Sequence, residues 1–369
     1  MAFEPRILHV LATPRAEGTP RLVLDWLAAR PDLWQGVLVL NSQPGDLKEP
    51  LQKGSRAYRE HDLLQPGFSQ FPRIVQASYR MVRDTRPNIV LCWVTGMASW
   101  VCEGARLAGC KKLLVHSGNP PRLGGKNDLI SCSVYWPLAL LRAKVICCSD
   151  YVRDANRSIR GVSRGLFQTV YNCARAREIS ARATRARQEI VKDGKFFTAI
   201  MVATLEKHKD HETLLKAIPS IVSRCPNFRL GLVGEGSLRG DLEQLADRLG
   251  IREQVTFLGT RSDVPELLGL ADLFVFSTTI NEGLGSVLLE AMAAKLPVVA
   301  TDVPACRELL QGGRLGQLVP PQRPELLAEA ILDKIQNRES SAHTVPTAFD
   351  YVEQFTPARM IDQYLRWVR

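Results

Sequence analysis

The chain of 369 residues lacks any apolar run that could cross a membrane. Its longest apolar runs, such as Ile89–Val94 and Leu296–Ala300, have the length of a strand, whereas a membrane helix needs about 20 residues. No basic segment followed by an apolar core opens the chain, so we expect Ile7–Ala12 to be a first strand and not a signal peptide. With 45% hydrophobic and 23% charged residues, the composition is that of a globular protein.

Cysteine pairs with redox or metal-binding spacing are also missing. The nine cysteines are scattered, their number is odd, and no CxxC pair occurs. His208 and His211 share a loop but lack the cysteine or carboxylate set of a zinc site. We therefore expect free, mostly buried thiols in a cytoplasmic protein that needs neither a metal nor another cofactor.

Acidic residues are scarce in the first half of the chain. Residues 1–200 hold 30 Lys and Arg against 16 Asp and Glu, a net charge of +14, whereas residues 201–369 hold 18 against 22, a net charge of −4. The stretch Arg153–Lys195 contains eleven of the basic residues. It is interpreted either as a solvated face or as a peripheral contact with the inner face of an anionic membrane. Nucleic acid is not an expected partner, because no binding motif is present and aromatic residues do not alternate with the arginines.

Strand-like and helix-like segments alternate along the chain, which predicts parallel sheets with crossover helices on both faces. In the first half, the expected strands are Arg6–Ala12, Val37–Asn41, Asn88–Trp93, Lys112–His116 and Lys144–Cys148, and the expected helices are Thr19–Ala29, Phe71–Thr85, Ser99–Ala108 and Ser149–Ile159.

The alternation restarts after an arginine-rich connection at about residues 172–195. The expected strands are Phe197–Val202, Phe228–Val233, Val255–Leu258, Leu273–Ser277 and Pro297–Thr301, and the expected helices are Lys209–Cys225, Leu238–Leu249, Val264–Ala271, Val287–Ala294, Arg323–Gln336 and Thr356–Arg369. We predict an α/β protein of two Rossmann-like, doubly wound domains facing a cleft, residues 1–174 and 175–350, followed by a C-terminal segment, residues 351–369, that can return to the first domain.

Two glutamates, Glu282 and Glu290, stand eight positions apart around the expected start of a helix. A helix start offers unpaired N–H groups and a partial positive charge, which suit a phosphate. Carboxylates beside it can accept hydrogen bonds from sugar hydroxyls. Two further glycine-bearing loops, residues 234–236 and Gly259, follow strands of the same sheet. They should lie on the same rim, which is the edge of the sheet at the carboxyl ends of its strands. The pattern indicates a nucleotide-sugar site, although glutamates at this spacing also occur on exposed helix faces.

The sequence resembles the retaining glycosyltransferases of family 4, which have two Rossmann-like domains in the GT-B fold. The likeness is dense from about residue 197 to 310 and thin over residues 1–170. Its segments are Glu282–Glu290, the family's Glu-x7-Glu motif, together with Leu232–Gly236, Val255–Gly259, Asp263–Pro265, Leu289–Ala293 and Pro297–Asp302. The resemblance implies that the first domain binds the acceptor and the second binds the nucleotide sugar.

The resemblance also implies roles for single residues. The expected catalytic residues are Glu282, which contacts hydroxyls of the transferred sugar, Lys209, which neutralises the departing diphosphate, and His116, near the acceptor and the donor sugar. The expected donor-binding residues are Glu290 for the ribose, Gly283, Leu284, Gly285 and Ser286 for the diphosphate, Gly259, Thr260 and Arg261 for the nucleobase, and Gly18 in the loop before the first helix. Purely structural roles are the alternatives for His116, as a hydrogen-bonded strand residue, and for Lys209, in a solvated turn.

One departure from the family concerns the phosphate contacts. Thr204 stands where the family has an arginine, five residues before Lys209, so this contact is missing or is supplied by Lys207 or Arg261. We expect a hexosyltransferase of polysaccharide or glycolipid biosynthesis that moves a sugar, with retention of configuration, from a nucleoside diphosphate, UDP by family frequency alone, to a glycan, lipid or small-molecule acceptor. A catalytically silent GT-B scaffold is the alternative that Thr204 supports. An NAD-dependent dehydrogenase is disfavoured, because no G-x-G-x-x-G follows the first strand.

Overall fold

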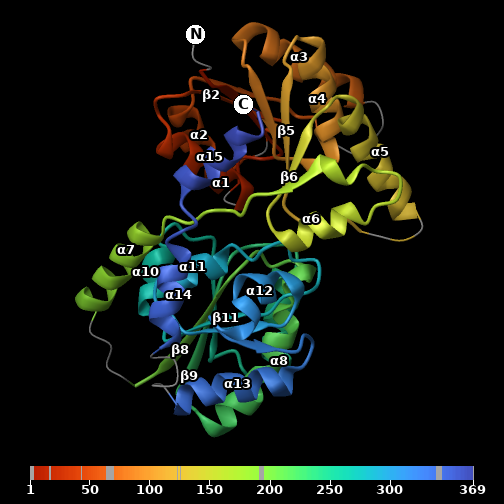
Figure 1. The fold of residues 1–369 in the computed structure, drawn as a ribbon. Coiled ribbons are helices and arrows are strands. Elements are labelled where there is room, and N and C mark those ends of the chain that lie inside the picture. Colours follow the sequence, from red (N-terminus) through yellow and green to blue (C-terminus); the bar gives the residue numbers. More distant parts are fainter. Residues whose placement is uncertain are drawn as a thin grey trace. The chain divides into compact units, whose positions relative to one another are not determined.

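The computed structural model describes residues 4–15, 18–42, 44–63, 70–122, 124, 126–190, 195–337 and 343–368. The chain divides into two compact units, which are treated separately below. The first unit comprises residues 1–172 and 357–369, and the second comprises residues 173–356. Each contains one parallel sheet with helices on both faces (Figure 1).

The first unit is built on a seven-stranded parallel sheet in the order β3-β2-β1-β4-β5-β6-β7. Its strands are β1 (Arg6–Leu11), β2 (Trp34–Val39), β3 (Ala57–Glu60), β4 (Ile89–Cys92), β5 (Lys112–Ser117), β6 (Lys144–Cys147) and β7 (Phe167–Thr169). The central strands β1, β4 and β5 are buried over nearly their whole length, because helices cover both faces of the sheet. That double burial explains why these strands are continuous apolar runs in the sequence.

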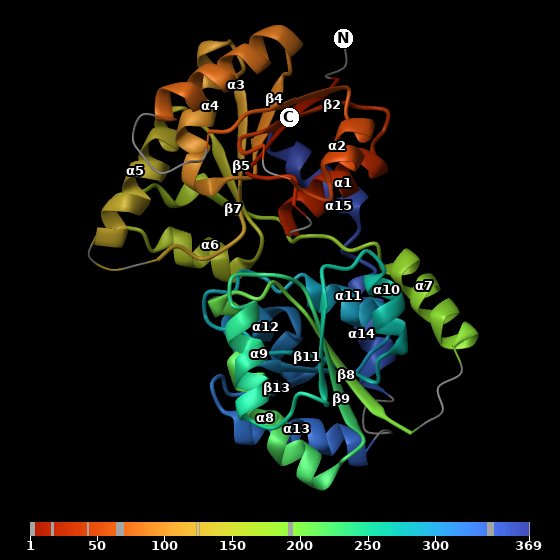
Figure 2. The same cartoon turned by 180° about the vertical axis from the view of Figure 1, so that it is seen from behind.

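The helices of the first unit form two layers. They are α1 (Gly18–Ala29), α2 (Lys48–Gly54), α3 (Phe71–Thr85), α4 (Ala98–Leu107), α5 (Lys126–Leu140), α6 (Asp150–Arg157) and α15 (Pro357–Arg366). On one face of the sheet α1 packs on α2 and α15, and on the other face α3 packs on α4 and α4 packs on α5 (Figures 1 and 2). The last helix of the chain therefore completes the first unit, with Met360, Ile361, Tyr364 and Leu365 on its buried side.

The second unit repeats the architecture with a six-stranded parallel sheet in the order β10-β9-β8-β11-β12-β13. Its strands are β8 (Phe197–Val202), β9 (Phe228–Val233), β10 (Val255–Gly259), β11 (Leu273–Phe276), β12 (Val298–Thr301) and β13 (Gln317–Val319). Its helices are α7 (Ala176–Glu189), α8 (His211–Arg224), α9 (Arg239–Arg248), α10 (Val264–Leu270), α11 (Val287–Ala293), α12 (Pro304–Leu309), α13 (Pro324–Gln336) and α14 (Thr344–Val352).

The predicted α/β class with two doubly wound parallel sheets is confirmed. The structure also contains elements that the sequence did not predict. They are three short strands, β3, β7 and β13, and five helices, α2, α5, α7, α12 and α14. The predicted cleft depends on how the two units are arranged and stays a prediction.

The arginine-rich stretch requires a correction. It is not simply a connection, because α7 occupies its middle and packs on α10 and α11 as part of the second unit. The buried residues of α7 are Ala176, Ile179, Ala183 and Ala186, at helical spacing. Three of the four are alanines, so the stripe is only weakly apolar and the arginines dominate the composition. Seven of the nine cysteines are buried, as expected.

Candidate functional site

Four loops meet at the carboxyl edge of the six-stranded sheet of the second unit. They are residues 203–210 after β8, 234–238 after β9, 260–263 after β10 and 277–286 after β11. Because the strands are parallel, their carboxyl ends all lie at this edge, where ligands bind in open α/β sheets. The sequence predicted this rim from its glycine-bearing loops.

Backbone hydrogen bonds join the loops to one another. The amide of Gly234 donates to the carbonyl of Gly259 at 2.8 Å, and the amide of Leu205 donates to the carbonyl of Glu235 at 3.0 Å. The amide of Thr279 donates to the carbonyl of His208 at 3.0 Å. The rim is therefore a connected surface and not a set of independent loops.

Glycine is required where the loop after β8 passes against the loop after β9. Gly234 has φ of 140°, and a Cβ there would lie 2.0 Å from the carbonyl oxygen of Ala203. At Gly236 a Cβ would lie 2.4 Å from the carbonyl oxygen of Leu205. Any side chain at either position would push the two loops apart.

Glu282 and Lys209 form a buried ion pair on this rim. The Nζ of Lys209 contacts the Oε2 of Glu282, and the two side chains are 16% and 8% exposed. The Lys209 ammonium also lies 5.4 Å from the ring centroid of Phe276, at the end of β11. The interpretation of Lys209 as part of a solvated turn is therefore wrong, although its predicted role toward a phosphate is a separate question.

The remaining bonds of Glu282 order the loop that leads into α11. Its Oε1 accepts the amides of Gly283 at 3.2 Å and Gly285 at 3.1 Å. The hydroxyl of Thr278 lies 3.3 Å from the Oε2 of Glu282 but closer, at 2.9 Å, to the carbonyl of His208, to which it donates its single proton. Burial by itself raises the pKa of Glu282, but the charge and hydrogen bond of Lys209 outweigh it, and the pKa lies below its ordinary value of 4.5. Glu282 is thus ionised at neutral pH.

Glu290 is the fourth residue of α11, one turn inside the helix, and is half-buried. Between the two glutamates, Gly283, Leu284 and Gly285 are buried and Ser286 is half-buried. Gly285 has φ of 73°, the left-handed conformation that glycine adopts most readily. The predicted donor residues of this segment therefore lie together, but two of its amides point at Glu282.

The loop after β10 contains the residues predicted to frame a nucleobase. Gly259 has φ of 67°, and a Cβ there would lie 3.0 Å from a carboxylate oxygen of Glu235. Thr260 and Arg261 are exposed. Asp263 accepts two hydrogen bonds from the guanidinium of Arg261, at 2.8 and 2.7 Å. Arg261 is therefore already engaged by a neighbouring carboxylate, which weakens the case that it replaces the arginine absent at Thr204.

Several buried polar atoms near this rim have no hydrogen-bond partner among the described residues. They are the Oγ of Ser277, the Oδ2 of Asp210 and the Nδ1 of His211. Burial lowers the pKa of His211 to about 4, so its ring is neutral at pH 7. Buried polar atoms of this kind gain most from a polar ligand or an ordered water.

His116 lies in the first unit, at the carboxyl end of β5. It is 2% exposed, its Nδ1 lies 2.7 Å from the hydroxyl of Tyr364 on α15, and its ring centroid lies 4.9 Å from that of Trp93. Burial lowers the pKa of His116 to about 4. The Nε2 lies 3.3 Å from the position that a Cβ of Gly118 would occupy, so glycine keeps that side of the ring open. The neutral imidazole is thus fixed at Nδ1.

The sequence prediction did not identify Tyr364 or Thr278 as partners of the site. The spacing of the buried residues in the C-terminal helix is the signal that could have placed Tyr364 inside the first unit. Gly18 is the first residue of α1 and is exposed, and a Cβ there would meet nothing within 4 Å. Its neighbour Glu17 lies outside the described residues.

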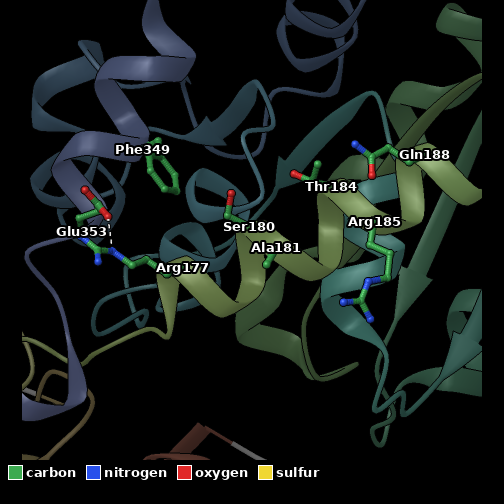
Figure 3. Close-up of a pocket in the computed structure, with 8 residues that line it drawn as sticks. All are labelled: Arg177, Ser180, Ala181, Thr184, Arg185, Gln188, Phe349 and Glu353. Atoms are coloured by element: carbon green, nitrogen blue, oxygen red, sulfur yellow. Dashed lines mark hydrogen bonds and ion pairs between the residues drawn. The ribbon is translucent and has the colours of Figure 1, made fainter.

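A separate hollow of about 560 Å³ lies between α7 and α14 in the second unit (Figure 3). It is lined by Arg177, Ser180, Ala181, Thr184, Arg185, Gln188, Phe349 and Glu353. The guanidinium of Arg177 pairs with Glu353 at 2.8 Å across its end. The hollow contains none of the predicted site residues and no convergent set of catalytic groups, so we do not assign the candidate site to it.

Most of the second unit resembles a known protein family. Residues 183–350 match the profile of the family described as glycosyl transferases group 1. The match falls within the second unit, which is therefore similar to this family. The matched residues include Lys209, Glu282 and Glu290.

Sequence relatives cover part of the chain. The phosphatidyl-myo-inositol mannosyltransferase of Mycobacterium tuberculosis is 40% identical over 131 residues, 35% of this chain and 34% of that protein. The alpha-D-kanosaminyltransferase of Streptomyces kanamyceticus is 32% identical over 148 residues, 39% of this chain and 38% of that protein. The matches span about a third of the length of the first curated relatives.

Solved structures extend the likeness to the whole chain. Anabaena HepE in complex with UDP and glucose superposes with a TM-score of 0.84 at 20% identity, covering 99% of each chain. WaaG, a glycosyltransferase involved in lipopolysaccharide biosynthesis, superposes with a TM-score of 0.73 at 18% identity, covering 97% of this chain and 99% of that one. The predicted GT-B fold is thereby confirmed.

The described residues contain no group of three or more His, Cys, Asp or Glu that could hold a metal ion. In the described part of the chain, no helix has both the length and the apolar character needed to span a bilayer.

Proposed function

We propose that the protein transfers a sugar from a nucleoside diphosphate sugar to an acceptor, with retention of the anomeric configuration. The observation that carries the proposal is the Glu282–Lys209 pair, which lies on the same rim as Glu290 and the glycine loops, within the unit that matches the glycosyl transferases group 1 profile. Retention rests on the Glu-x7-Glu motif of the resembled family.

The hydrogen bonds of Glu282 support a specific division of roles. Oε1 is filled by two backbone amides, and Oε2 accepts Lys209, while the neighbouring Thr278 hydroxyl donates its proton to the carbonyl of His208. A carboxylate oxygen has about two lone-pair directions, so one on Oε2 remains for a hydroxyl of the transferred sugar. Lys209 then places its ammonium between Glu282 and the diphosphate, where it neutralises charge as the sugar–phosphate bond breaks. The leaving phosphate helps remove the proton of the acceptor, which attacks from the same face of the sugar.

The donor is held by the neighbouring loops in this proposal. Glu290 accepts hydrogen bonds from the ribose, the segment 284–286 meets the diphosphate, and the loop of Gly259, Thr260 and Arg261 borders the nucleobase. UDP is the favoured nucleotide, since HepE, which shares the fold, was solved with UDP and with UDP-glucose. The acceptor is a glycan, a lipid or a small molecule that binds the first unit, with His116 at the carboxyl end of β5 as its nearby catalytic residue.

We further place the protein in the cytoplasm, in peripheral contact with an anionic membrane, and propose that the transfer needs no metal or other cofactor. The basic first half of the chain supports the membrane contact, because residues 1–200 carry a net charge of +14.

A panel of UDP-, GDP- and ADP-sugars, with the released nucleotide identified by mass, tests the proposed reaction. Wild-type protein should release one nucleotide, and Glu282→Ala and Glu290→Ala should each lose at least about tenfold in rate, as expected when one charge-assisted hydrogen bond is removed. Glu253→Ala, which removes an exposed glutamate at the opposite end of β10, should retain full rate. Full activity in either site variant would refute the site.

A catalytically silent GT-B scaffold is the second candidate. Two observations favour it: Thr204 supplies no cation, and Arg261 is engaged by Asp263. Nucleotide binding without release of any nucleotide from any donor in the panel would establish this alternative.

A further inference from the structure

Helix α5 of the first unit is apolar on two opposite sides. Its inner side buries Ser131, Tyr135 and Leu138, at helical spacing. Its outer side exposes four large apolar side chains: Leu129 at 74%, Ile130 at 61%, Trp136 at 59% and Leu140 at 77%. A helix that is apolar all round is normally enclosed on every side, in a core or in lipid. The outer side of α5 therefore lacks a covering partner among the described residues.

Three of these side chains share one helix face. Leu129, Trp136 and Leu140 follow one another at intervals of seven and four residues, with the exposed Ser133 between the first two, and Ile130 flanks this face. Figures 1 and 2 show α5 at the outer side of the first unit, beside α4. Several large apolar side chains exposed together on a surface helix are typical of an interaction site.

Exposed arginines border this face. Arg142 follows the end of α5 directly, and the segment that carries Arg160 and Arg164 is tied to the helix by side-chain bonds. The indole of Trp136 donates to the carbonyl of Gly161 at 2.9 Å, and the thiol of Cys132 donates to the carbonyl of Arg160 at 3.2 Å. None of the three arginines makes an ion pair with a described residue, so their charges remain available.

Several other arginines of the stretch Arg153–Lys195, to which Arg160 and Arg164 also belong, do form ion pairs. Arg153 pairs with Asp150 and Asp154, Arg177 with Glu353, and Arg182 with Glu266. Their charges are largely neutralised within the protein, and their neighbourhood offers less exposed apolar surface than α5 does. The basic composition of this stretch is therefore a poor guide to where a membrane would bind.

We propose that the outer face of α5, namely Leu129, Ile130, Trp136 and Leu140 with Arg142, Arg160 and Arg164, docks on an anionic lipid surface. The helix has 15 residues and is about 22 Å long, too short to cross a bilayer core of about 30 Å, so it lies in the plane of the interface. The apolar side chains enter the acyl boundary and the arginines contact the lipid phosphates. This inference locates the proposed membrane contact and is independent of the transfer reaction.

Sedimentation with phosphatidylcholine vesicles, with and without phosphatidylglycerol, tests the docking face. Wild-type protein should bind the anionic vesicles more tightly than the neutral ones. Leu129→Gln and Leu140→Gln should each weaken binding about tenfold, since each removes one buried leucine from the interface. Arg142→Gln, Arg160→Gln and Arg164→Gln should each weaken it about fivefold and reduce its dependence on salt.

Matched controls in the second unit separate this face from the rest of the surface. Leu326→Gln removes a 45% exposed leucine, and Arg185→Gln removes an exposed arginine of the Arg153–Lys195 stretch. Both should bind as wild type does. Loss of binding in Arg185→Gln with full binding in Leu129→Gln and Leu140→Gln would show that the protein binds the membrane but not through α5. No binding of wild-type protein to anionic vesicles would overturn both.

A second copy of the chain or a protein partner is the competing occupant. Sedimentation velocity that showed self-association of wild-type protein, abolished by Leu129→Gln, would assign the face to a dimer and contradict the proposal. Release of nucleotide from the donor is unaffected by these substitutions in our account. A protein that binds vesicles through α5 but releases no nucleotide would refute the proposed reaction alone.

Discussion

Replacing Lys209 by Met should destabilise the second unit strongly at neutral pH. The methionine fills a similar volume but leaves Glu282 ionised, 8% exposed and without its cation. Breaking a buried ion pair by removing one partner costs about 3–5 kcal/mol. Glu282 would keep the amides of Gly283 and Gly285, so we expect the lower end of this range, about 3 kcal/mol.

The pH dependence of this loss follows from the pKa of Glu282. In the wild type the pKa lies below 4.5, so the stabilisation is fully present above pH 4.5 and is lost as the pH falls through the lowered value. Without Lys209, burial dominates and raises the pKa of Glu282 above 4.5. The variant should then gain stability as the pH falls toward that raised pKa, and the difference from wild type should shrink between pH 7 and pH 5.

Urea unfolding followed by two signals provides the assay. All six tryptophans lie in the first unit, so tryptophan fluorescence reports that unit, whereas far-UV circular dichroism reports both. The loss should be larger in the circular dichroism than in the fluorescence. The double variant Lys209→Met/Glu282→Gln removes both charges and should lose less than Lys209→Met alone. Equal stability of Lys209→Met and wild type, or a loss independent of pH, would refute the buried pair.

Three further predictions concern other contacts. Thr204→Arg should tighten UDP binding about tenfold in calorimetry, since it adds one charge-assisted hydrogen bond to the loop after β8, and an unchanged affinity would exclude a phosphate near this position. Tyr364→Phe leaves the Nδ1 of His116 without its 2.7 Å partner and should lower the stability of the first unit by about 1–3 kcal/mol in tryptophan-detected unfolding, whereas wild-type stability would contradict the bond. Burial lowers the pKa of His9 from 6.5 to about 4, so its neutral form is favoured by folding, and His9 alone should cost the first unit up to about 3 kcal/mol as the pH falls from 6.5 to 4, in addition to the loss from the equally buried His116. His9→Gln should remove its share of this dependence, and a stability that rises over the same interval would be inconsistent with a neutral buried His9.

The sequence predicted the central strands and the helices between them because those segments are long and strongly patterned. The strands it missed, β3, β7 and β13, are all edge strands of three or four residues, which carry little pattern of their own. Helix α5 was missed for another reason. With apolar residues on both sides it shows almost no helical periodicity, and the exposed apolar side chains that hide the helix in the sequence are also the basis of the proposed docking face.

The candidate site was predictable in its parts but not in its contacts. The glycine spacing and parallel topology implied that Glu282, Glu290 and Gly259 share a rim, because carboxyl ends of parallel strands meet at one edge. The pairing of Lys209 with Glu282 joins residues 73 positions apart, and no local pattern indicates it. The bond between His116 and Tyr364 joins residues 248 positions apart and depends on the return of the last helix to the first unit.

The most direct test of the central claim is a calorimetric titration of the protein with UDP, for the wild type and for Glu290→Ala. We predict saturable binding by the wild type, weakened at least about tenfold in Glu290→Ala and unchanged in the control Glu253→Ala. Absence of binding to UDP, GDP and ADP alike, or equal affinity of wild type and Glu290→Ala, would contradict a nucleotide-sugar site on this rim.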